Sequence, residues 1–276
     1  MQASTKSWVV PSGLLGRIVD EARERVEALK PLEAELRTSA MAAPPHPPFA
    51  AALRRDSLAL IAEIKRRSPS KGEINSRITI SMQARAYEDG GAAAISVLTE
   101  ERHFGGAVAD VAEARRSTRL PILRKDFIVD PLQIAEARAA GASAVLLIAR
   151  ALAPTELAHL AASAHSYGIE TLVEVRSDDE LDRALALPGS VIGVNSRDLE
   201  TLAMDRSVSA RLLPLIPSDR IAVAESGIAT VADATAFAHM GADALLVGSA
   251  LSASPDPAAL AAELASVARV GRARRD

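Results

Sequence analysis

The stretch Gly141-Ala142-Ser143-Ala144-Val145 carries the pattern Gly-Ala-x-Ala-apolar, which recurs at Gly91–Ile95 and at Gly241–Leu245. A weaker copy, Gly189–Gly193, lies between the copies at Gly141 and Gly241. Along the chain, successive glycines of the four copies are therefore 50, 48 and 52 residues apart. At about 25 residues per βα unit, each interval spans two units of a repeated fold. Each glycine is therefore expected to end a helix in a left-handed conformation and to lead into every second strand.

Short apolar runs surround these repeats and alternate with amphipathic segments. Runs that are apolar throughout are typical of parallel strands buried on both faces. They are Leu58–Ile64, Ala93–Leu98, Pro121–Leu123, Ala144–Ile148, Thr171–Val175, Val191–Val194, Ile221–Ala224 and Ala244–Val247. Helices are predicted at Pro131–Ala140, Pro154–Tyr167, Asp178–Leu187 and Val231–Met240, among others. The predicted fold is α/β, a (β/α)8 TIM barrel, because the alternative of an open doubly wound sheet gives no reason for the even glycine spacing.

The first 48 residues differ from the rest and predict an N-terminal helical extension. Within residues 14–36 apolar side chains recur every three or four positions, at Leu14, Ile18, Ala22, Val26 and Leu29, which is one face of a helix. Prolines at 44–48 end this segment, because proline cannot continue a helix. We expect a single domain over residues 1–276, with the extension and connector at 1–48 and the barrel at 49–276.

Composition excludes several classes of protein. A net charge of −3 gives no general attraction to nucleic acid or anionic lipid, and the arginine-rich run Arg269–Arg274 is expected to be a solvated tail. Without cysteine there is neither a disulfide nor a thiolate metal site. No apolar run reaches the roughly 18–20 residues that cross a bilayer, and the first 12 residues lack a secretory signal. We expect a cytoplasmic protein that binds neither nucleic acid nor membrane.

Polar residues follow the predicted strands at the end where barrel enzymes carry their chemistry. Alternation places Glu63 and Lys65 on one face of the first strand. Later strands end in Lys125, Glu174, Asn195-Ser-Arg197 and Glu225-Ser226-Gly227. The opposite strand ends carry few lysines or carboxylates, so we interpret the set as functional rather than merely solvated. Lysines that face carboxylates suit general acid–base catalysis, and a Schiff-base lysine is the alternative that the residues leave open.

Two Gly-Ser pairs predict a phosphate subsite. Ser226-Gly227 follows the seventh strand and Gly248-Ser249 follows the eighth, where barrels frequently bind phosphate through backbone N–H groups. Ser68, in the first βα loop, is a third candidate contact. The five histidines show no metal-ligand spacing, and neither nucleotide-binding glycine motif occurs, so we expect no metal and no such cofactor.

These motifs resemble those of the indole-3-glycerol phosphate synthase family, from about Leu14 to the end of the chain. The stretches that carry the resemblance are Ala62-Glu-Ile-Lys-Arg-Arg-Ser-Pro-Ser70, Ser96-Val-Leu-Thr-Glu-Glu101, Phe104-Gly-Gly106, Leu123-Arg-Lys-Asp-Phe-Ile-Val129, Leu172-Val-Glu-Val175, Ile192-Gly-Val-Asn-Ser-Arg-Asp-Leu199 and Val223-Ala-Glu-Ser-Gly-Ile228. The resemblance implies a carboxy-lyase of tryptophan biosynthesis that needs neither metal nor organic cofactor. Its substrate would be 1-(2-carboxyphenylamino)-1-deoxyribulose 5-phosphate, which closes to indole-3-glycerol phosphate with loss of CO2 and water.

The resemblance also implies roles for individual residues. Lys125 is similar to the general acid that protonates the substrate carbonyl oxygen, and Glu174 to the group that stabilises the developing cation or deprotonates the intermediate. Lys65 and Glu63 are similar to the pair that binds the carboxylate and assists dehydration, and Asn195 to the residue that orients substrate hydroxyls. The division of acid and base roles between Lys65 and Lys125 stays open.

Arg197 is expected to recognise the anthranilate carboxylate or to hold the site together, and Phe104 and Phe127 are expected to pack against the aromatic ring. The chain departs from the family at Asn75–Thr79, where Asn-Pro and acidic residues are usual. A rival barrel enzyme, phosphoribosylanthranilate isomerase, needs a catalytic cysteine that this chain lacks. An inactive sensor barrel would be expected to have lost the strand-end lysines and glutamates. We expect a monomer with, at most, transient contacts to other enzymes of the pathway.

Overall fold

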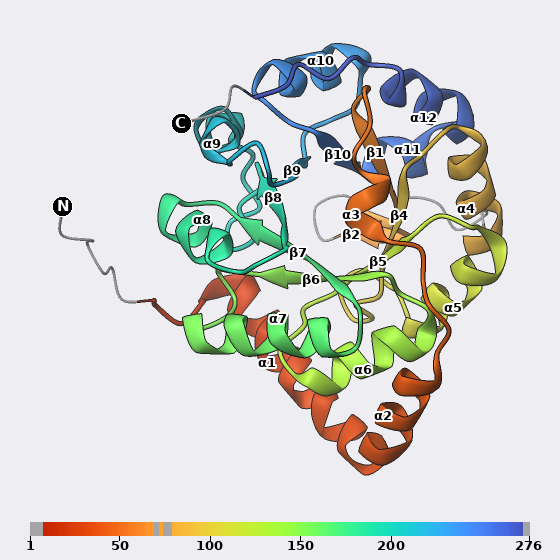
Figure 1. The fold of residues 1–276 in the computed structure, drawn as a ribbon, viewed down its shortest axis with the longest axis vertical. Helices are drawn as coiled ribbons and strands as arrows, with labels where there is room; N and C mark the ends of the chain where they lie inside the picture. The colour runs from red at the N-terminus through yellow and green to blue at the C-terminus, as the bar shows by residue number, and fades with distance from the viewer. Residues whose placement is uncertain (1–7, 69–71, 74–78, 273–276) are drawn as a thin grey trace.

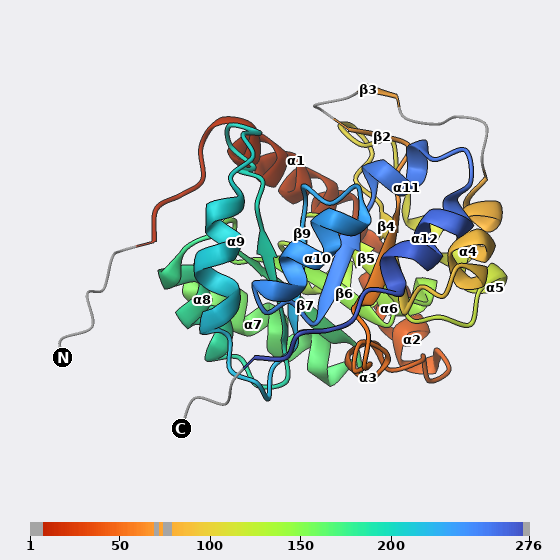
Figure 2. The same ribbon diagram turned by 90° about the horizontal axis from the view of Figure 1, so that it is seen from above.

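The structure, a computed structural model, describes residues 8–68, 72–73 and 79–272. Parallel strands close a barrel in the order β1-β10-β9-β8-β7-β6-β5-β4, which confirms the predicted α/β class and (β/α)8 architecture (Figure 1). The barrel strands are β1 (Ala59–Ile64), β4 (Ala94–Leu98), β5 (Ile122–Lys125), β6 (Ala144–Ile148), β7 (Glu170–Val175), β8 (Val191–Asn195), β9 (Ala222–Glu225) and β10 (Ala244–Val247). A short antiparallel ladder of β2 (Arg67–Ser68) and β3 (Gly72–Glu73) follows β1 outside the barrel (Figure 2).

Helices surround the barrel wall and cover its outer face (Figures 1 and 2). They are α4 (Ile80–Asp89), α5 (Val108–Ser117), α6 (Pro131–Ala140), α7 (Pro154–Ser166), α8 (Asp178–Leu185), α9 (Arg206–Leu212) with the 3-10 turn η2 (Leu213–Leu215), α10 (Val231–His239), α11 (Ser249–Ala253) and α12 (Pro257–Ala265). The strands are buried along almost their whole length, and only Lys125 and Glu170 within them are half-buried. Burial on both faces explains why the strands are apolar runs rather than alternating patterns. No helix in the described ranges is long and apolar enough to cross a membrane.

The glycines of the internal repeat occupy the positions that the spacing predicted. Gly91, Gly141, Gly189 and Gly241 have φ of 78°, 100°, 74° and 96°, which is the left-handed region. They precede β4, β6, β8 and β10, which are the second, fourth, sixth and eighth barrel strands along the chain. A residue with a side chain is strained in this conformation, so glycine is what allows each tight turn into a strand.

The N-terminal extension differs from the single helix expected over residues 14–36. It consists of α1 (Gly13–Leu29), the 3-10 turn η1 (Lys30–Leu32) and α2 (Glu33–Ala42). Pro31 is the physical reason for the break, because it has no N–H to donate and its ring disfavours a continuous α-helix. The proline-rich connector then leads to the short helix α3 (Phe49–Ala52), and Arg138 of α6 donates to the carbonyl oxygens of Ala43 and Pro44, at 2.9 and 2.7 Å.

The C-terminal arginines contradict the expected solvated tail as far as residue 272. Arg269 and Arg272 form ion pairs with Asp243, at 3.1 and 2.8 Å. Arg272 also donates to the carbonyl oxygens of Gly241 and Arg220, both at 2.6 Å, and its side chain is only 5% exposed. The arginines are drawn in because Asp243, at the variable position of the third repeat, is a buried carboxylate that needs compensating charge. Arg274 lies outside the described residues.

Candidate active site

A cavity of about 450 Å³ opens at the carboxyl ends of the barrel strands. Its lining contains the residues that the sequence predicted for the site: Glu63, Lys65, Phe104, Lys125, Phe127, Glu174, Asn195, Arg197, Glu225, Ser226, Gly227, Gly248 and Ser249. The exception is Ser68, which ends β2 and whose side chain lies outside the described part of the chain, as does the departure at residues 75–78. The fold therefore brings residues from strands far apart in the sequence into one cavity.

Two lysines and two glutamates form an ion-pair chain across this cavity. Lys65 Nζ lies 2.8 Å from Glu63 Oε1, and Lys125 Nζ lies 3.9 Å from Glu63 Oε2 and 4.0 Å from Glu174 Oε2. Glu63 thus bridges both lysines. Burial raises the pKa of Glu63, but the charges of Lys65 and Lys125 outweigh it, and the pKa falls below the usual value. The carboxylate is therefore ionised at neutral pH.

Lys125 is protonated in this environment. Burial lowers its pKa, but Glu63, Glu174 and Glu225 together raise it well above the usual lysine value. A Schiff-base lysine must lose its proton to act as a nucleophile, whereas a general acid must keep it. The charge balance therefore favours the acid–base alternative over the Schiff-base one.

Glu225 is a buried carboxyl group of a different kind. Its side chain is 1% exposed, and its carboxyl group lies beside that of Glu174. Burial and the charge of Glu174 raise the pKa of Glu225 well above the usual value, and Lys125 offsets only part of this. The carboxyl of Glu225 therefore holds its proton more tightly than an ordinary glutamate does. The sequence predicted its position but not its raised pKa.

Two glycines make room for these carboxyl groups. A Cβ on Gly193 would lie 2.1 Å from Glu225 Oε1, and a Cβ on Gly248 would lie 2.1 Å from Glu63 Oε1. Either contact is far shorter than van der Waals separation, so the glutamates occupy the space left by the missing side chains. Gly248 was predicted as a phosphate contact, and its position beside Glu63 shows a further role. Gly193 was not among the predicted site residues.

Arg197 and Asn195 are fixed by the loop after β8. Asn195 is 4% exposed, and its Oδ1 accepts a hydrogen bond from the backbone N–H of Arg197 at 2.9 Å. Arg197 Nη1 donates to the carbonyl oxygen of Leu202 at 2.9 Å. On the other side of the cavity the rings of Phe104 and Phe127 lie 6.4 Å apart at a tilt of 33° and form an apolar wall. A charged end and an aromatic wall suit a substrate that joins an anion to a ring.

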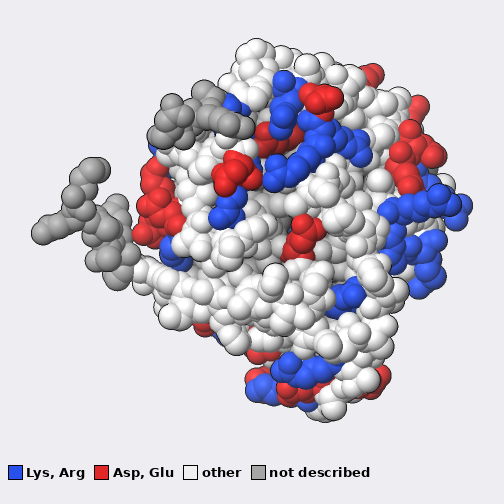
Figure 3. All heavy atoms as spheres, viewed as in Figure 1, with Lys and Arg blue, Asp and Glu red and all other residues white. Residues whose placement is uncertain are grey.

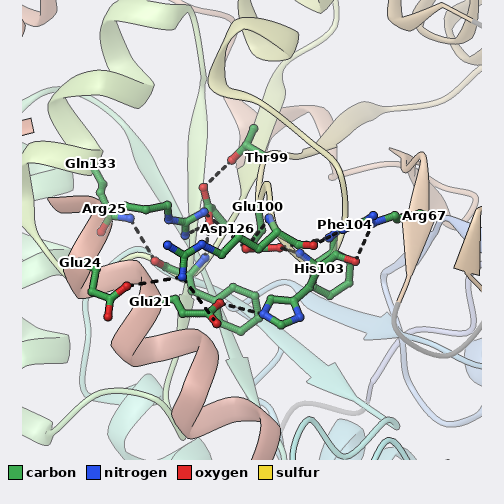
Figure 4. A network of polar contacts seen from close by, with 12 residues as sticks. Glu21, Glu24, Arg25, Arg67, Thr99, Glu100, His103, Phe104, Asp126 and Gln133 are labelled. Carbon is green, nitrogen blue, oxygen red and sulfur yellow. Dashed lines mark hydrogen bonds and ion pairs between the residues drawn. The ribbon is translucent and has the colours of Figure 1, made fainter. Parts of the chain in front are cut away.

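Behind Lys125, a polar network joins α1 to the ends of β4 and β5 (Figure 4). Asp126, which is 2% exposed, accepts from Arg25 at 2.9 Å, from Thr99 at 2.6 Å and from Arg124 at 3.1 Å. Sequence reasoning missed this network. The signal was available in the charged residues on either side of Lys125, because adjacent strand residues point to opposite faces.

A second part of the same network holds the loop that carries Phe104 (Figure 4). Buried Glu100 accepts from the backbone N–H groups of Arg102, His103 and Phe104, at 3.0, 2.7 and 3.1 Å. The His103 ring lies 2.8 Å from Glu21 on α1. Ligand atoms of Glu21, Glu100 and His103 lie within 4.8 Å of one another, but each already has protein partners. The group therefore orders the loop against α1.

Charge on the opposite end of the molecule is mixed. Figure 3 shows the face on which α3 lies, where basic and acidic side chains are interspersed rather than gathered into one basic patch. This distribution agrees with the small net charge and gives no continuous surface for a polyanion on that face.

Comparison with known proteins gives the family. The model of the indole-3-glycerol phosphate synthase family matches residues 15–264. Indole-3-glycerol phosphate synthase 2 of Streptomyces coelicolor is 49% identical, over 89% of this chain and 96% of its own. Indole-3-glycerol phosphate synthase of Opitutus terrae is 46% identical, over 92% of this chain and 98% of its own. A thiamine phosphate pyrophosphorylase from Pyrococcus furiosus, 17% identical, shares the fold alone, with a TM-score of 0.57 over 77% of this chain and 95% of that one. The chain belongs to the indole-3-glycerol phosphate synthase family.

Proposed function

We propose that this protein converts 1-(2-carboxyphenylamino)-1-deoxyribulose 5-phosphate to indole-3-glycerol phosphate, CO2 and water, as a carboxy-lyase of tryptophan biosynthesis. The observation that carries the proposal is a protonated Lys125 within 4.0 Å of two carboxylates, in a cavity that also holds an aromatic wall. Family membership supports the choice of substrate. We further propose a cytoplasmic monomer that needs neither metal nor organic cofactor.

Ring closure is the step that needs an acid. As the aryl carbon attacks the substrate carbonyl carbon, negative charge develops on the carbonyl oxygen, and Lys125 gives this oxygen a proton. The C–C bond to the carboxylate then breaks, CO2 leaves, and the bonding pair returns to the aryl ring. The neighbouring carboxylates keep Lys125 charged until the carbonyl oxygen becomes basic enough to take the proton.

Dehydration follows on the new ring. The hydroxyl leaves as water when Lys65, paired with Glu63, gives it a proton, and the ring nitrogen supplies electrons to the cation that forms. Glu174 stabilises this cation and takes the proton from the adjacent ring carbon, which leaves the indole double bond. Asn195 orients the substrate hydroxyls during these steps.

Substrate binding divides between the two ends of the cavity. Arg197 is proposed to recognise the anthranilate carboxylate, while Phe104 and Phe127 pack against the ring. The phosphate is proposed to bind at the turns Ser226-Gly227 and Gly248-Ser249 with Ser68, and Glu225 lines the same cavity. Binding at these two ends of the cavity is proposed to hold the reacting carbon atoms of the substrate next to Lys125.

The test is direct turnover. Purified protein treated with EDTA should convert the aminodeoxyribulose substrate to a fluorescent indole product, and Lys125→Met purified in parallel should be slower by roughly 10²–10⁴-fold. Turnover that returns only after metal is added would exclude the cofactor-free proposal. Absence of turnover under every metal condition, from protein that is folded, would exclude the reaction itself.

A further inference from the structure

The loop between β9 and α10 is held in an unusual backbone conformation. Ser226 and Gly227 have φ of 68° and 76°, so two successive residues are left-handed, and the first of them carries a side chain. Such a conformation persists only when the surroundings hold it. In the described parts of the chain, the backbone N–H groups of Gly227 and Ile228 donate to no other residue. Both residues line the cavity, so the loop offers unpaired donors to a ligand.

Arg206 of α9 anchors this loop at the cavity rim. Its Nη2 donates both to the carbonyl oxygen of Gly227 and to Asp233 Oδ1, the latter at 2.6 Å. Its guanidinium carbon lies 5.6 Å from the centre of the Phe237 ring on α10, a cation–π distance. One side chain therefore ties the left-handed turn to the first turn of the following helix.

Asp233 connects this anchor to the rest of the loop. Its Oδ2 accepts from the backbone N–H groups of Ala229 and Thr230 and from the Thr230 hydroxyl, each at 3.0 Å. Burial raises the pKa of Asp233, but the bonds from Arg206, Ala229 and Thr230 outweigh it and lower the pKa. The ionised carboxylate thus holds the end of the loop while Arg206 holds its beginning.

We propose that Arg206 is a positioning residue for the phosphate subsite, which it serves by fixing the Gly227 carbonyl so that the N–H groups of Gly227 and Ile228 stay available to the phosphate. The inference rests on the phosphate subsite proposed above. Arg206 lies at the cavity rim, but its charge is engaged by Asp233, so it acts through the loop rather than as the principal phosphate ligand. Neither a motif nor its spacing pointed to it.

The experiment compares Arg206→Met with Arg211→Met. Arg211 lies on the same helix and pairs with Asp178 away from the loop, so the control loses the same charge and a similar ion pair. For Arg206→Met we expect both the KM for substrate and the dissociation constant of inorganic phosphate, measured by calorimetry, to rise roughly tenfold, as loss of a charged hydrogen bond predicts. The value of kcat should stay within about twofold, because the reacting atoms are elsewhere. Arg206→Lys should recover part of the phosphate affinity.

Asp233→Asn separates positioning from direct contact. If Arg206 positions the loop, weakening its partner should weaken phosphate binding too. If Arg206 itself binds phosphate, releasing it from Asp233 should leave phosphate binding equal or tighter, and that result overturns the proposal. Equal phosphate affinity in Arg206→Met and wild type also overturns it while leaving the subsite intact. A wild-type protein that turns over substrate but does not bind inorganic phosphate removes the subsite, and the proposal with it.

Discussion

Lys125 supplies the positive charge that balances the buried glutamates of the cavity. Lys125→Met removes the proton donor but keeps most of the side-chain volume, so we expect kcat to fall by roughly 10²–10⁴-fold, the usual contribution of a general acid. Binding of the phosphorylated product should change much less, because the phosphate end of the cavity is untouched. Steady-state kinetics and equilibrium product binding measure the two effects. The control for loss of charge is Lys30→Met, at an exposed ion pair of the extension. Near-normal kcat in Lys125→Met would show that Lys125 is not the general acid.

Glu225 makes a prediction about stability and pH. Because its folded-state pKa is raised above the unfolded value, its stability contribution is fully present below about pH 4.5 and is lost as the pH rises toward the folded pKa. Glu225→Gln has no proton to lose, so the variant should gain stability relative to wild type as the pH rises, by at most about 1.4 kcal/mol per pH unit. Urea unfolding at several pH values between 5 and 8 checks this. A stability difference that does not vary with pH would mean that folding does not raise the pKa of Glu225.

At the residue scale, the sequence predicted the features of the site that depend on one strand and missed those that depend on several strands. Alternation along β1 placed Glu63 and Lys65 on one face, and their 2.8 Å ion pair confirms it. The raised pKa of Glu225 and the room that Gly193 and Gly248 provide arise where neighbouring strands meet. These features depend on strand register and on the separation of side chains across the barrel, and a local sequence pattern specifies neither.

At the scale of elements, Asp126 is the point where α1, β4 and β5 are joined. Asp126→Ala leaves the buried guanidinium of Arg124 without one of its two carboxylate partners, so we expect the free energy of unfolding to fall by about 3 kcal/mol. We also expect kcat to fall, because Lys125 is the adjacent residue. Denaturant unfolding and steady-state kinetics measure both. The control is Asp20→Ala, an exposed carboxylate on α1, which should change stability by less than about 0.5 kcal/mol.

An Asp126→Ala protein as stable as the Asp20→Ala control would show that the extension is held to the barrel by other contacts.

The helices and strands themselves were more predictable from the sequence than the contacts between them. Long apolar runs identified the barrel strands, because both of their faces are buried. The break at Pro31 was missed because the apolar spacing continues past it, and the bond from Arg25 to Asp126 joins residues 101 positions apart.

At the scale of the whole molecule, the two ends of the barrel have different tasks. The cavity lies at the carboxyl ends of the strands, while Asp243 precedes β10 at the other end, where the C-terminal Arg269 and Arg272 pair with it. This separation is expected of the fold, in which residues at the amino ends of the strands serve stability. The glycine repeat predicted the closed ring, but the docking of the C-terminal arginines depends on a carboxylate that only the closed ring buries.

Arg272→Met tests this division. It removes one of two cations beside Asp243 and three hydrogen bonds to carbonyl oxygens, so we expect a loss of up to about 3 kcal/mol in the free energy of unfolding. The values of kcat and KM at temperatures well below unfolding should stay at the wild-type level, because the substitution lies at the end of the barrel away from the cavity. Thermal unfolding and kinetics on the same preparation give both results. A fall in kcat while the protein is still fully folded would show that the two ends of the barrel are coupled. The C-terminal arginines would then affect catalysis as well as stability.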